Sequence, residues 1–236
     1  MGIGRSELAH ILPSIEAAGY DGKENVSFCE LGNNYIERGN ENILSWLHSF
    51  APDIDVPMGG EQHSKGIVSK RFWEAIGFNH VSIDLNGLDG ALSYDLREDI
   101  NKKYNYKEQF DIVYEGGTVE HVSNQYWAFK NTHNLTKKGG TMIHILPKVG
   151  FWENHCSYFY TIDSFSKLAE LCSYKVQELR EIDPAPWIQE AGPMIYTRLE
   201  KTDNKDFIDE KAFEQVPITF TGWDANDKSL YPNCYK

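Results

Sequence analysis

The sequence has no long hydrophobic run and few cysteines. Among its 236 residues, no stretch approaches the roughly 20 consecutive apolar residues of a transmembrane helix. Its first residues lack the apolar segment and small-residue cleavage pattern of a secretory signal. The four cysteines are scattered and form no Cys-x-x-Cys pair, so a structural zinc site is not expected. Free cysteines suit a reducing compartment, and we expect a cytoplasmic protein that does not contact membranes.

Positive charge is also scarce. The formal net charge is −12, from 35 acidic and 23 basic residues. Proteins that bind long nucleic acids normally need a basic surface to replace phosphate counterions. The densest basic pairs, Lys102-Lys103 and Lys137-Lys138, are isolated from one another. Long nucleic acid is therefore not an expected partner, although a small basic pocket is compatible with this charge.

What the sequence does contain is an alternation of short apolar segments and amphipathic ones, which is typical of a parallel α/β sheet. The expected strands cover residues 25–31, 80–85, 92–96, 110–116, 140–147, 175–182 and 194–200. The expected helices cover residues 64–78, 124–136 and 161–174. We expect a single domain over residues 1–201, a lid-like insertion at 35–63 and a C-terminal extension, 202–236, packed on the domain.

Four consecutive expected strands each have a carboxylate at or next to their last residue. These carboxylates are Glu30, with a glycine two positions later at Gly32, then Asp84, Asp95 and Glu115. Ligands of open α/β sheets bind beyond the carboxyl ends of the strands. There, an acid after the second strand can accept hydrogen bonds from ribose hydroxyls, and one after the third can accept from an exocyclic amine. A single acid at a strand end is more often a turn or helix cap, but four in order indicate a nucleoside-type ligand.

The segments "CELGNN", "VSIDLNG", "YDLRED", "FDIVYEGGTVEHV" and "NLTKKGGTMIHILP" resemble the class I S-adenosylmethionine-dependent methyltransferases over roughly residues 25–200. The last two are the most specific, although Lys138 stands where proline is commoner in the family. The resemblance implies an α/β, Rossmann-like fold with helices on both faces of a mostly parallel seven-stranded sheet of 3-2-1-4-5-7-6 order. It also implies S-adenosyl-L-methionine as cofactor and S-adenosyl-L-homocysteine as product.

The resemblance also assigns cofactor contacts by position. They are Glu30, Gly32 and Asn33 beside the methionine part, Asp84 at the ribose, Leu85 against the adenine, Asp95 and the Leu96 backbone at the adenine amine, and Glu115 and Gly116 near the sulfonium. The first loop departs from the family pattern, because Asn33 and Asn34 occupy a stretch that usually holds further glycines. Asparagine tolerates left-handed backbone angles, so the loop can still turn.

Residues that act on the acceptor are expected after the fourth and fifth strands. Two histidines lie there: His121 in "GTVEHV" and His155 in the aromatic-rich "GFWENHCSYFYT". Histidine titrates near neutrality and is a natural general base. The structural alternative is that His121 packs against the cofactor pocket and that the aromatics near His155 form core or a lid. The spacing of these histidines with Glu120 and His144 matches no metal-ligand pattern, so no metal is expected.

The sequence lacks the Asn/Asp-Pro-Pro-aromatic turn expected of adenine-base methylases after the fourth strand. We therefore predict a methyltransferase that acts on an oxygen or nitrogen of a small polar metabolite, such as a sugar or sugar nucleotide. One alternative is a non-catalytic methyltransferase-like partner subunit, which would bind the cofactor, or nothing, and methylate no acceptor. A second is an NAD-linked oxidoreductase, which the absent G-x-G-x-x-G disfavours.

Overall fold

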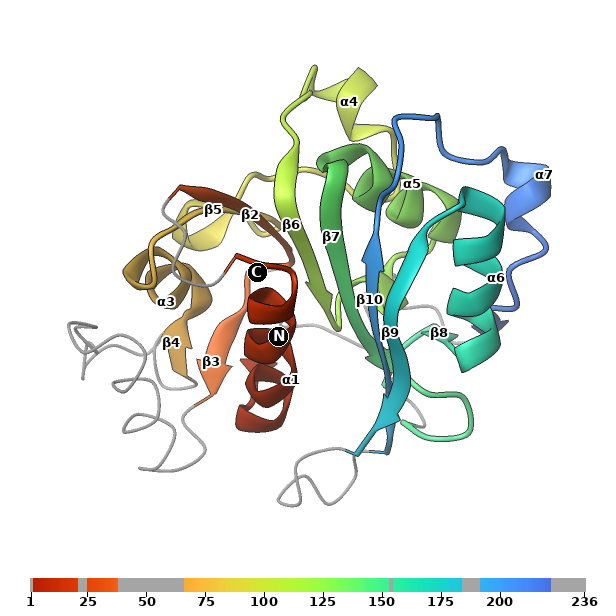
Figure 1. Ribbon diagram of the computed structural model, residues 1–236, viewed down its shortest axis with the longest axis horizontal. Coiled ribbons are helices and arrows are strands. Elements are labelled where there is room, and N and C mark those ends of the chain that lie inside the picture. The colour runs from red at the N-terminus through yellow and green to blue at the C-terminus, as the bar shows by residue number, and fades with distance from the viewer. Residues whose placement is uncertain (1, 21–24, 38–65, 153–154, 184–191, 222–236) are drawn as a thin grey trace.

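A computed structural model describes residues 2–20, 25–37, 66–152, 155–183 and 192–221. Its centre is a six-stranded sheet in the order β5-β2-β6-β7-β10-β9 (Figure 1). The strands are β2 (Val26–Leu31), β5 (Phe78–Ile83), β6 (Phe110–Gly116), β7 (Thr136–Pro147), β9 (Lys175–Ile182) and β10 (Met194–Glu200). The first four are parallel, and β10 runs antiparallel to both of its neighbours. This is the expected Rossmann-like arrangement.

The expected strand at 92–96 is the main difference from the predicted sheet. Residue Leu92 makes only an isolated parallel bridge with Ile83 at the edge of β5. Beyond it, Asp95 belongs to no regular element and Leu96 begins a turn. The short segment ends at a turn that the Asp95 carboxylate itself stabilises by accepting the Arg97 backbone N–H at 2.9 Å, so the chain leaves the sheet before a full strand can pair.

Helices cover both faces of the sheet (Figure 1). They are α1 (Arg5–Ala17), α3 (Ser69–Ala75), α4 (Ile100–Lys103), α5 (Gln125–Leu135), α6 (Ile162–Cys172) and α7 (Glu210–Phe213), with 3-10 turns η2 (Leu88–Gly90) and η3 (Val119–His121). One buried cluster joins α1 and α3 to the sheet and includes Phe28 and Trp73. A second joins α5 and α6 to the other face and includes Phe129 and Phe165. Cys29 of β2, a free cysteine, is fully buried in this second cluster.

The sequence predicts the start of α6 and the end of α3 well, but it predicts the start of α3 poorly. Helix α6 begins after Thr161, whose side chain accepts the Ser164 N–H in a capping box. Helix α3 ends at Ala75, and two residues later the chain turns at Gly77, which has φ +94°. The expected helix at 64–78 was too long, because residues 66–68 form β4 (Gly66–Val68) instead. Strand β4 pairs with β3 (Tyr35–Glu37), so backbone pairing overrides the helical pattern there.

Short strands attach both ends of the described chain to the domain. Strand β1 (Gly2–Ile3) pairs with β3 in parallel, and β11 (Thr219–Phe220) pairs with β8 (Tyr158–Phe159). Ahead of β11, Phe207, Phe213 and Val216 are buried against the α5–α6 face. Most of the insertion expected as a lid, and residues 222–236 of the extension, lie outside the described residues.

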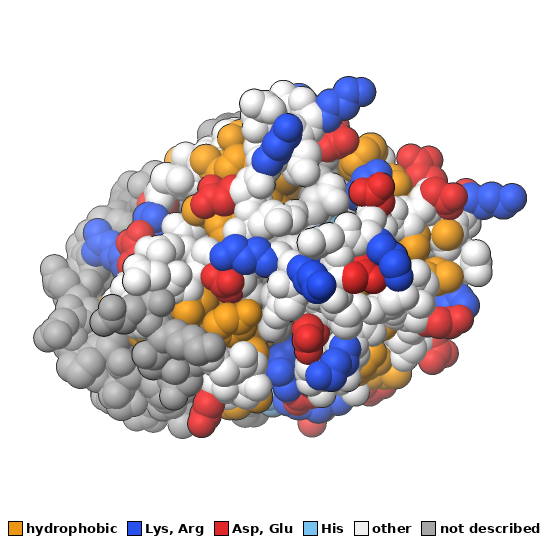
Figure 2. Space-filling model, turned by 45° about the horizontal axis from the view of Figure 1, so that its top comes forward, with side chains coloured by type: hydrophobic (Ala, Val, Ile, Leu, Met, Phe, Trp, Pro, Cys, Tyr) orange, Lys and Arg blue, Asp and Glu red, His pale blue; other side chains and the backbone are white. Residues whose placement is uncertain are grey.

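The described helices are all too short or too polar to cross a lipid bilayer. The surface seen in Figure 2 carries acidic and basic side chains interspersed, without one sign dominating. Ion pairs connect several of them, including Lys103 with Glu98 at 2.6 Å and Lys137 with Asp111 at 3.0 Å. On the face shown, the described residues form no basic stripe of the kind that binds phosphate backbones.

The buried His133 predicts a pH dependence of stability. Its Nε2 lies 2.9 Å from the Lys205 carbonyl and must donate to it, so Nδ1 accepts from the Tyr174 hydroxyl at 2.7 Å. Burial, reinforced by the charge of Lys201, lowers the pKa of His133 to about 4. The unfolded chain therefore binds a proton at His133 before the folded chain does, and stability falls as the pH drops from about 6.5 towards 4.

Urea unfolding at pH 7 and pH 4.5 measures this effect. We expect His133 to account for a loss of about 2 kcal/mol between these two values. The His133→Gln variant does not titrate in this window and should show a correspondingly smaller loss. An unchanged pH dependence in the variant would show that His133 is not responsible.

Candidate cofactor and acceptor site

Three strand ends meet at one edge of the sheet. In the pairing register, Leu31 lies opposite both Ile83 of β5 and Glu115 of β6. The residues that follow these strand ends therefore lie side by side, and the Gly32 N–H donates to the Ile83 carbonyl at 2.8 Å. The edge predicted from the order of the acids is thus formed by neighbouring strands.

Gly32 turns the chain sharply at this edge. Its φ is +96°, a conformation that residues with a Cβ rarely adopt. A Cβ at this position would overlap the hydroxyl oxygen of Thr118, which donates to the Leu31 carbonyl at 3.0 Å. The turn at Thr118 lies so close that only glycine fits at position 32. Both the backbone angle and the short distance to Thr118 therefore require a glycine there.

Asp84 lies beside the Gly32 turn and is half-buried. One carboxylate oxygen accepts the Asn33 N–H at 2.8 Å and the other accepts the Asn86 N–H at 2.9 Å. A carboxylate offers about four lone-pair sites, so two acceptor positions remain for ligand hydroxyls. The next residue, Leu85, is 51% exposed and has a free apolar surface at the same edge. This pair suits a ribose and an adenine ring.

Asp95 and Leu96 are less available for contacts with a cofactor than the resemblance implies. The Asp95 carboxylate accepts two bonds from the Arg97 guanidinium, one of them 2.7 Å from Nη2. Burial opposes ionisation of Asp95, but hydrogen bonds and charge from Arg97 outweigh it and lower the pKa. The Leu96 side chain is in the core, and its carbonyl accepts from Asn131 at 3.2 Å.

Glu30 is fully buried and is bound within the protein. One of its oxygens accepts from the Ser69 hydroxyl at 2.5 Å and lies 3.1 Å from His80 Nε2. Ser69 is the first residue of α3, and both its N–H and its hydroxyl also bond the Asn34 carbonyl. Glu30 therefore links the first loop to α3 and supports this loop from within the core.

Glu115 is also fully buried but faces the opposite side of the sheet. It pairs with Leu31, whereas Glu30 pairs with Tyr114, and side chains alternate along a strand. One Glu115 oxygen accepts the backbone N–H groups of Thr118 at 2.7 Å and Val119 at 2.9 Å. This carboxylate thus fixes the turn that leads into η3.

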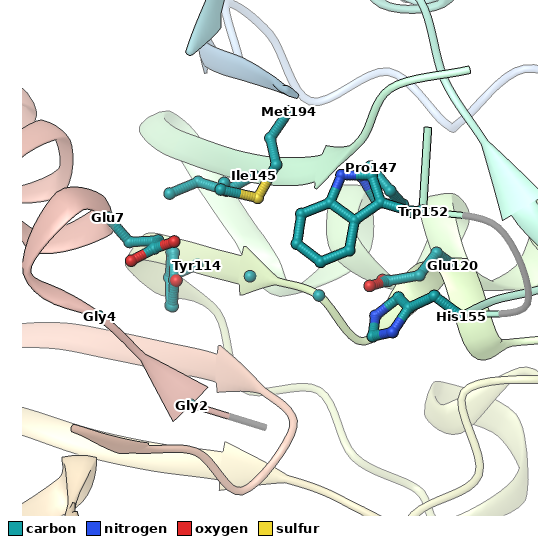
Figure 3. Close-up of a pocket in the computed structure, with 12 residues that line it drawn as sticks. Gly2, Gly4, Glu7, Tyr114, Glu120, Ile145, Pro147, Trp152, His155 and Met194 are labelled. Carbon is teal, nitrogen blue, oxygen red and sulfur yellow. The ribbon is translucent and has the colours of Figure 1, made fainter. Parts of the chain in front are cut away.

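A cavity of about 240 Å³ begins at Gly116, beside this edge (Figure 3). Its lining residues are Gly2, Gly4, Glu7, Tyr114, Gly116, Gly117, Glu120, Ile145, Pro147, Trp152, His155 and Met194. Apolar and aromatic side chains form most of the wall. Two acidic side chains, Glu7 and Glu120, lie on opposite sides in the view of Figure 3. The cavity is the right size for a small organic molecule.

One wall of the cavity holds a cluster of Glu120, His121 and His155. Glu120 Oε1 lies 3.8 Å from His121 Nε2, and the two imidazole rings are 5.3 Å apart between centroids. Burial, reinforced by the charge of Glu115, raises the pKa of Glu120 well above its usual range. Burial, with a smaller contribution from His155, lowers the pKa of His121 to about 3. Burial also lowers the pKa of His155.

The two segments that carry this cluster are joined by the backbone. The Ser157 N–H donates to the Glu120 carbonyl at 3.2 Å, which connects the loop after β7 to η3. In the same loop, the His155 N–H bonds the Trp152 carbonyl at 3.1 Å, and Trp152 Nε1 donates to the Pro193 carbonyl at 3.2 Å. The histidines predicted from the sequence are therefore brought together by defined contacts.

Several cavity residues gave no signal in the sequence. Glu7 comes from α1, which precedes the first expected strand, and Met194 begins β10. Neither follows a parallel strand, so the argument from strand ends does not reach them. Tyr114 lies inside β6 on the α1 face, and its aromatic character is equally typical of core.

Comparison with known proteins gives structural matches only. No family model and no curated protein sequence matches this chain. Among solved structures, 1,6-didemethyltoxoflavin-N1-methyltransferase from Burkholderia thailandensis, with bound 1,6-didemethyltoxoflavin and S-adenosylhomocysteine, aligns over 83% of this chain and 79% of its own, at 12% identity and a TM-score of 0.50. The N-methyltransferase NodS from Bradyrhizobium japonicum WM9 aligns over 85% and 89%, at 9% identity and a TM-score of 0.46.

A putative S-adenosylmethionine-dependent methyltransferase from Listeria monocytogenes aligns over 82% of this chain and all of its own, at 10% identity and a TM-score of 0.48. The sheet order and the match to the toxoflavin enzyme define the class of fold. The chain has the Rossmann-like fold of the class I S-adenosylmethionine-dependent methyltransferases.

Proposed function

We propose that this protein is an S-adenosyl-L-methionine-dependent methyltransferase acting on an oxygen or nitrogen of a small polar metabolite. The observation that carries the proposal is the junction of two sites at one sheet edge. The Gly32 turn and Asp84 lie at the ends of β2 and β5, and Gly116, at the end of the neighbouring strand β6, lines the cavity. A methyl donor on the edge and an acceptor in the cavity would then meet near Gly116.

The residues of the proposed cofactor site have two roles: some contact the cofactor, and others position the loops around it. Gly32, Asn33, Asp84, Leu85 and Gly116 are proposed to contact it, and Glu30, Asp95, Leu96 and Glu115 to shape the loops around it. Asp84 keeps acceptor positions for two ribose hydroxyls, and Leu85 offers an exposed apolar side chain for the adenine. When bound, the cofactor supplies an electrophilic methyl group and leaves as S-adenosyl-L-homocysteine.

His155 and His121 are proposed to activate the acceptor. A hydroxyl or amine must lose a proton as it is methylated, and a positioned imidazole can take it. His155 lines the cavity, whereas the lowered pKa of His121, about 3, makes it a weak base. Trp152, whose ring is tilted by 47° to that of His155 with centroids 5.1 Å apart, gives the cavity an aromatic wall against which a flat or sugar-like acceptor ring could pack.

Calorimetric titration with S-adenosyl-L-homocysteine tests the cofactor part of the proposal. We expect the wild-type protein to bind one equivalent and Asp84→Ala to bind at least about tenfold more weakly, because two charge-assisted hydrogen bonds are lost. The matched control is His155→Ala, which is proposed to act on the acceptor and should retain the wild-type affinity.

No binding by the wild type would overturn the proposal. Binding together with no methyl transfer from labelled cofactor to a panel of phenols, amines and sugars would favour the alternative of a non-catalytic partner subunit. Nicotinamide dinucleotide serves as a second probe in the same titration, and preferential binding of it would favour an oxidoreductase.

A further inference from the structure

The cluster of Glu120, His121 and His155 brings together three side-chain atoms of the kinds that bind metal ions. Glu120, His121 and His155 each offer one ligand atom, and all three atoms lie within 4.8 Å of one another. They come from η3 and from the loop after β7, which the Ser157-to-Glu120 backbone hydrogen bond holds together. From the sequence no metal was expected at these residues, because adjacent Glu120-His121 with one distant histidine is not a recognisable ligand spacing.

A second observation concerns the Glu120 carboxylate. Its side chain is only 2% exposed, and its Oε2 has no hydrogen-bond partner among the described residues. A buried carboxylate oxygen without a donor or cation is costly, and native structures rarely leave one in that state. Oε1 lies 3.8 Å from His121 Nε2, which is longer than a hydrogen bond. The described residues therefore leave Oε2 of this buried carboxylate available to a ligand.

We propose that Glu120, His121 and His155 bind one divalent transition-metal ion, of the zinc class, at the wall of the cavity. Two imidazoles and one carboxylate suit such an ion better than they suit Mg²⁺ or Ca²⁺, which prefer oxygen ligands. Zinc–ligand bonds of about 2.0 to 2.1 Å place tetrahedral donor atoms about 3.3 Å apart. The three donor atoms lie within 4.8 Å of one another, and Glu120 Oε1 lies 3.8 Å from His121 Nε2, so the proposal requires the side chains to move closer when the ion binds.

The open coordination positions of this ion would face the acceptor. Glu120 and His155 both line the cavity, so an ion bound between them borders the same space (Figure 3). A bound cation lowers the pKa of a coordinated hydroxyl or water. The catalytic role of the ion rests on the proposed function: it would activate the acceptor in place of a free imidazole base. Metal binding itself does not depend on that function.

The test uses the full chain after treatment with a chelator. Zn²⁺ is titrated by calorimetry and Co²⁺ by its visible absorption, which reports imidazole ligation and coordination number. We expect one equivalent of Zn²⁺ to bind with low-micromolar or tighter affinity. His155→Ala and Glu120→Gln should each weaken Zn²⁺ binding at least about 100-fold. Loss of a residue that only hydrogen-bonds to a metal ligand already weakens binding by up to about 100-fold, and these two substitutions each remove a ligand itself. His10→Ala, which removes a histidine of α1 outside the cluster, should leave binding unchanged.

Two results would overturn the metal site. One is an absence of stoichiometric Zn²⁺ binding by the wild type, and the other is equal affinity in the wild type and His155→Ala. If Glu120→Gln fails to fold, the less buried His121→Ala replaces it, with circular dichroism as the check. Titration with S-adenosyl-L-homocysteine in the same samples separates the two proposals, because the cofactor contacts lie outside the cluster.

Discussion

Replacing Gly32 by alanine is expected to destabilise the protein by about 2 to 4 kcal/mol and to abolish measurable binding of S-adenosyl-L-homocysteine. The backbone term, about 1 to 2 kcal/mol, arises because φ is +96°. The rest arises because the new Cβ overlaps the Thr118 hydroxyl and forces the 118 turn away from the strand ends. Urea unfolding measures the first effect and calorimetry the second.

Gly77→Ala is the matched control for this substitution. Gly77 has nearly the same backbone angle, φ +94°, but no atom lies within 4 Å of a Cβ built on it. It should cost only about 1 kcal/mol and leave ligand binding intact. Removing the obstructing hydroxyl with Thr118→Ala in the Gly32→Ala background should recover part of the lost stability. Equal losses for Gly32→Ala and Gly77→Ala would contradict the importance of the close approach.

Glu115→Ala is expected to destabilise the protein by about 3 kcal/mol. The substitution leaves the backbone N–H groups of Thr118 and Val119 without their shared acceptor, and the Val119 N–H is buried. Hydrogen bonds to a charged group contribute about 1.5 to 3 kcal/mol each, and an unpaired buried donor costs a comparable amount. Thermal or urea unfolding provides the measurement.

Glu115→Gln separates the hydrogen bonds from the charge. Glutamine keeps an oxygen for the two N–H groups and loses the negative charge that faces His144, whose Nδ1 lies 3.7 Å from Oε2. We expect a loss of about 1 kcal/mol for this variant. If Glu115→Gln were as damaging as Glu115→Ala, the charge facing His144 and not the capped turn would be the dominant contribution.

The sheet was largely predictable from the sequence because strands such as β2 and β6 are almost entirely buried and read as apolar runs. The boundaries of β6, β9 and β10 agree with the expected strands at 110–116, 175–182 and 194–200. The prediction of a strand at 92–96 was wrong because a short alternating pattern does not show whether a neighbouring strand pairs with the segment. The start of α3 was wrong because residues 66–68 pair with β3, a contact made across many intervening residues.

The candidate site was predictable in position and less so in detail. Strand-end acids do meet at one edge, since Leu31 is level with both Ile83 and Glu115. Sequence position cannot show that Arg97 binds Asp95, or that Ser69 donates to Glu30, because those contacts depend on side-chain direction. The grouping of Glu120 with two histidines depends on how a loop after β7 folds back onto η3. Strand periodicity contains no information about that folding.

The last strand of the sheet has a consequence for behaviour in concentrated solution. In the described part of the chain, β9 is an edge strand and pairs only with β10. An open edge of this kind invites strand addition between molecules and the growth of aggregates. Charged side chains recur along β9, among them Lys175, Glu178 and Arg180, and an added strand would have to bury them. The charges on this edge therefore protect the protein from self-association through its own sheet.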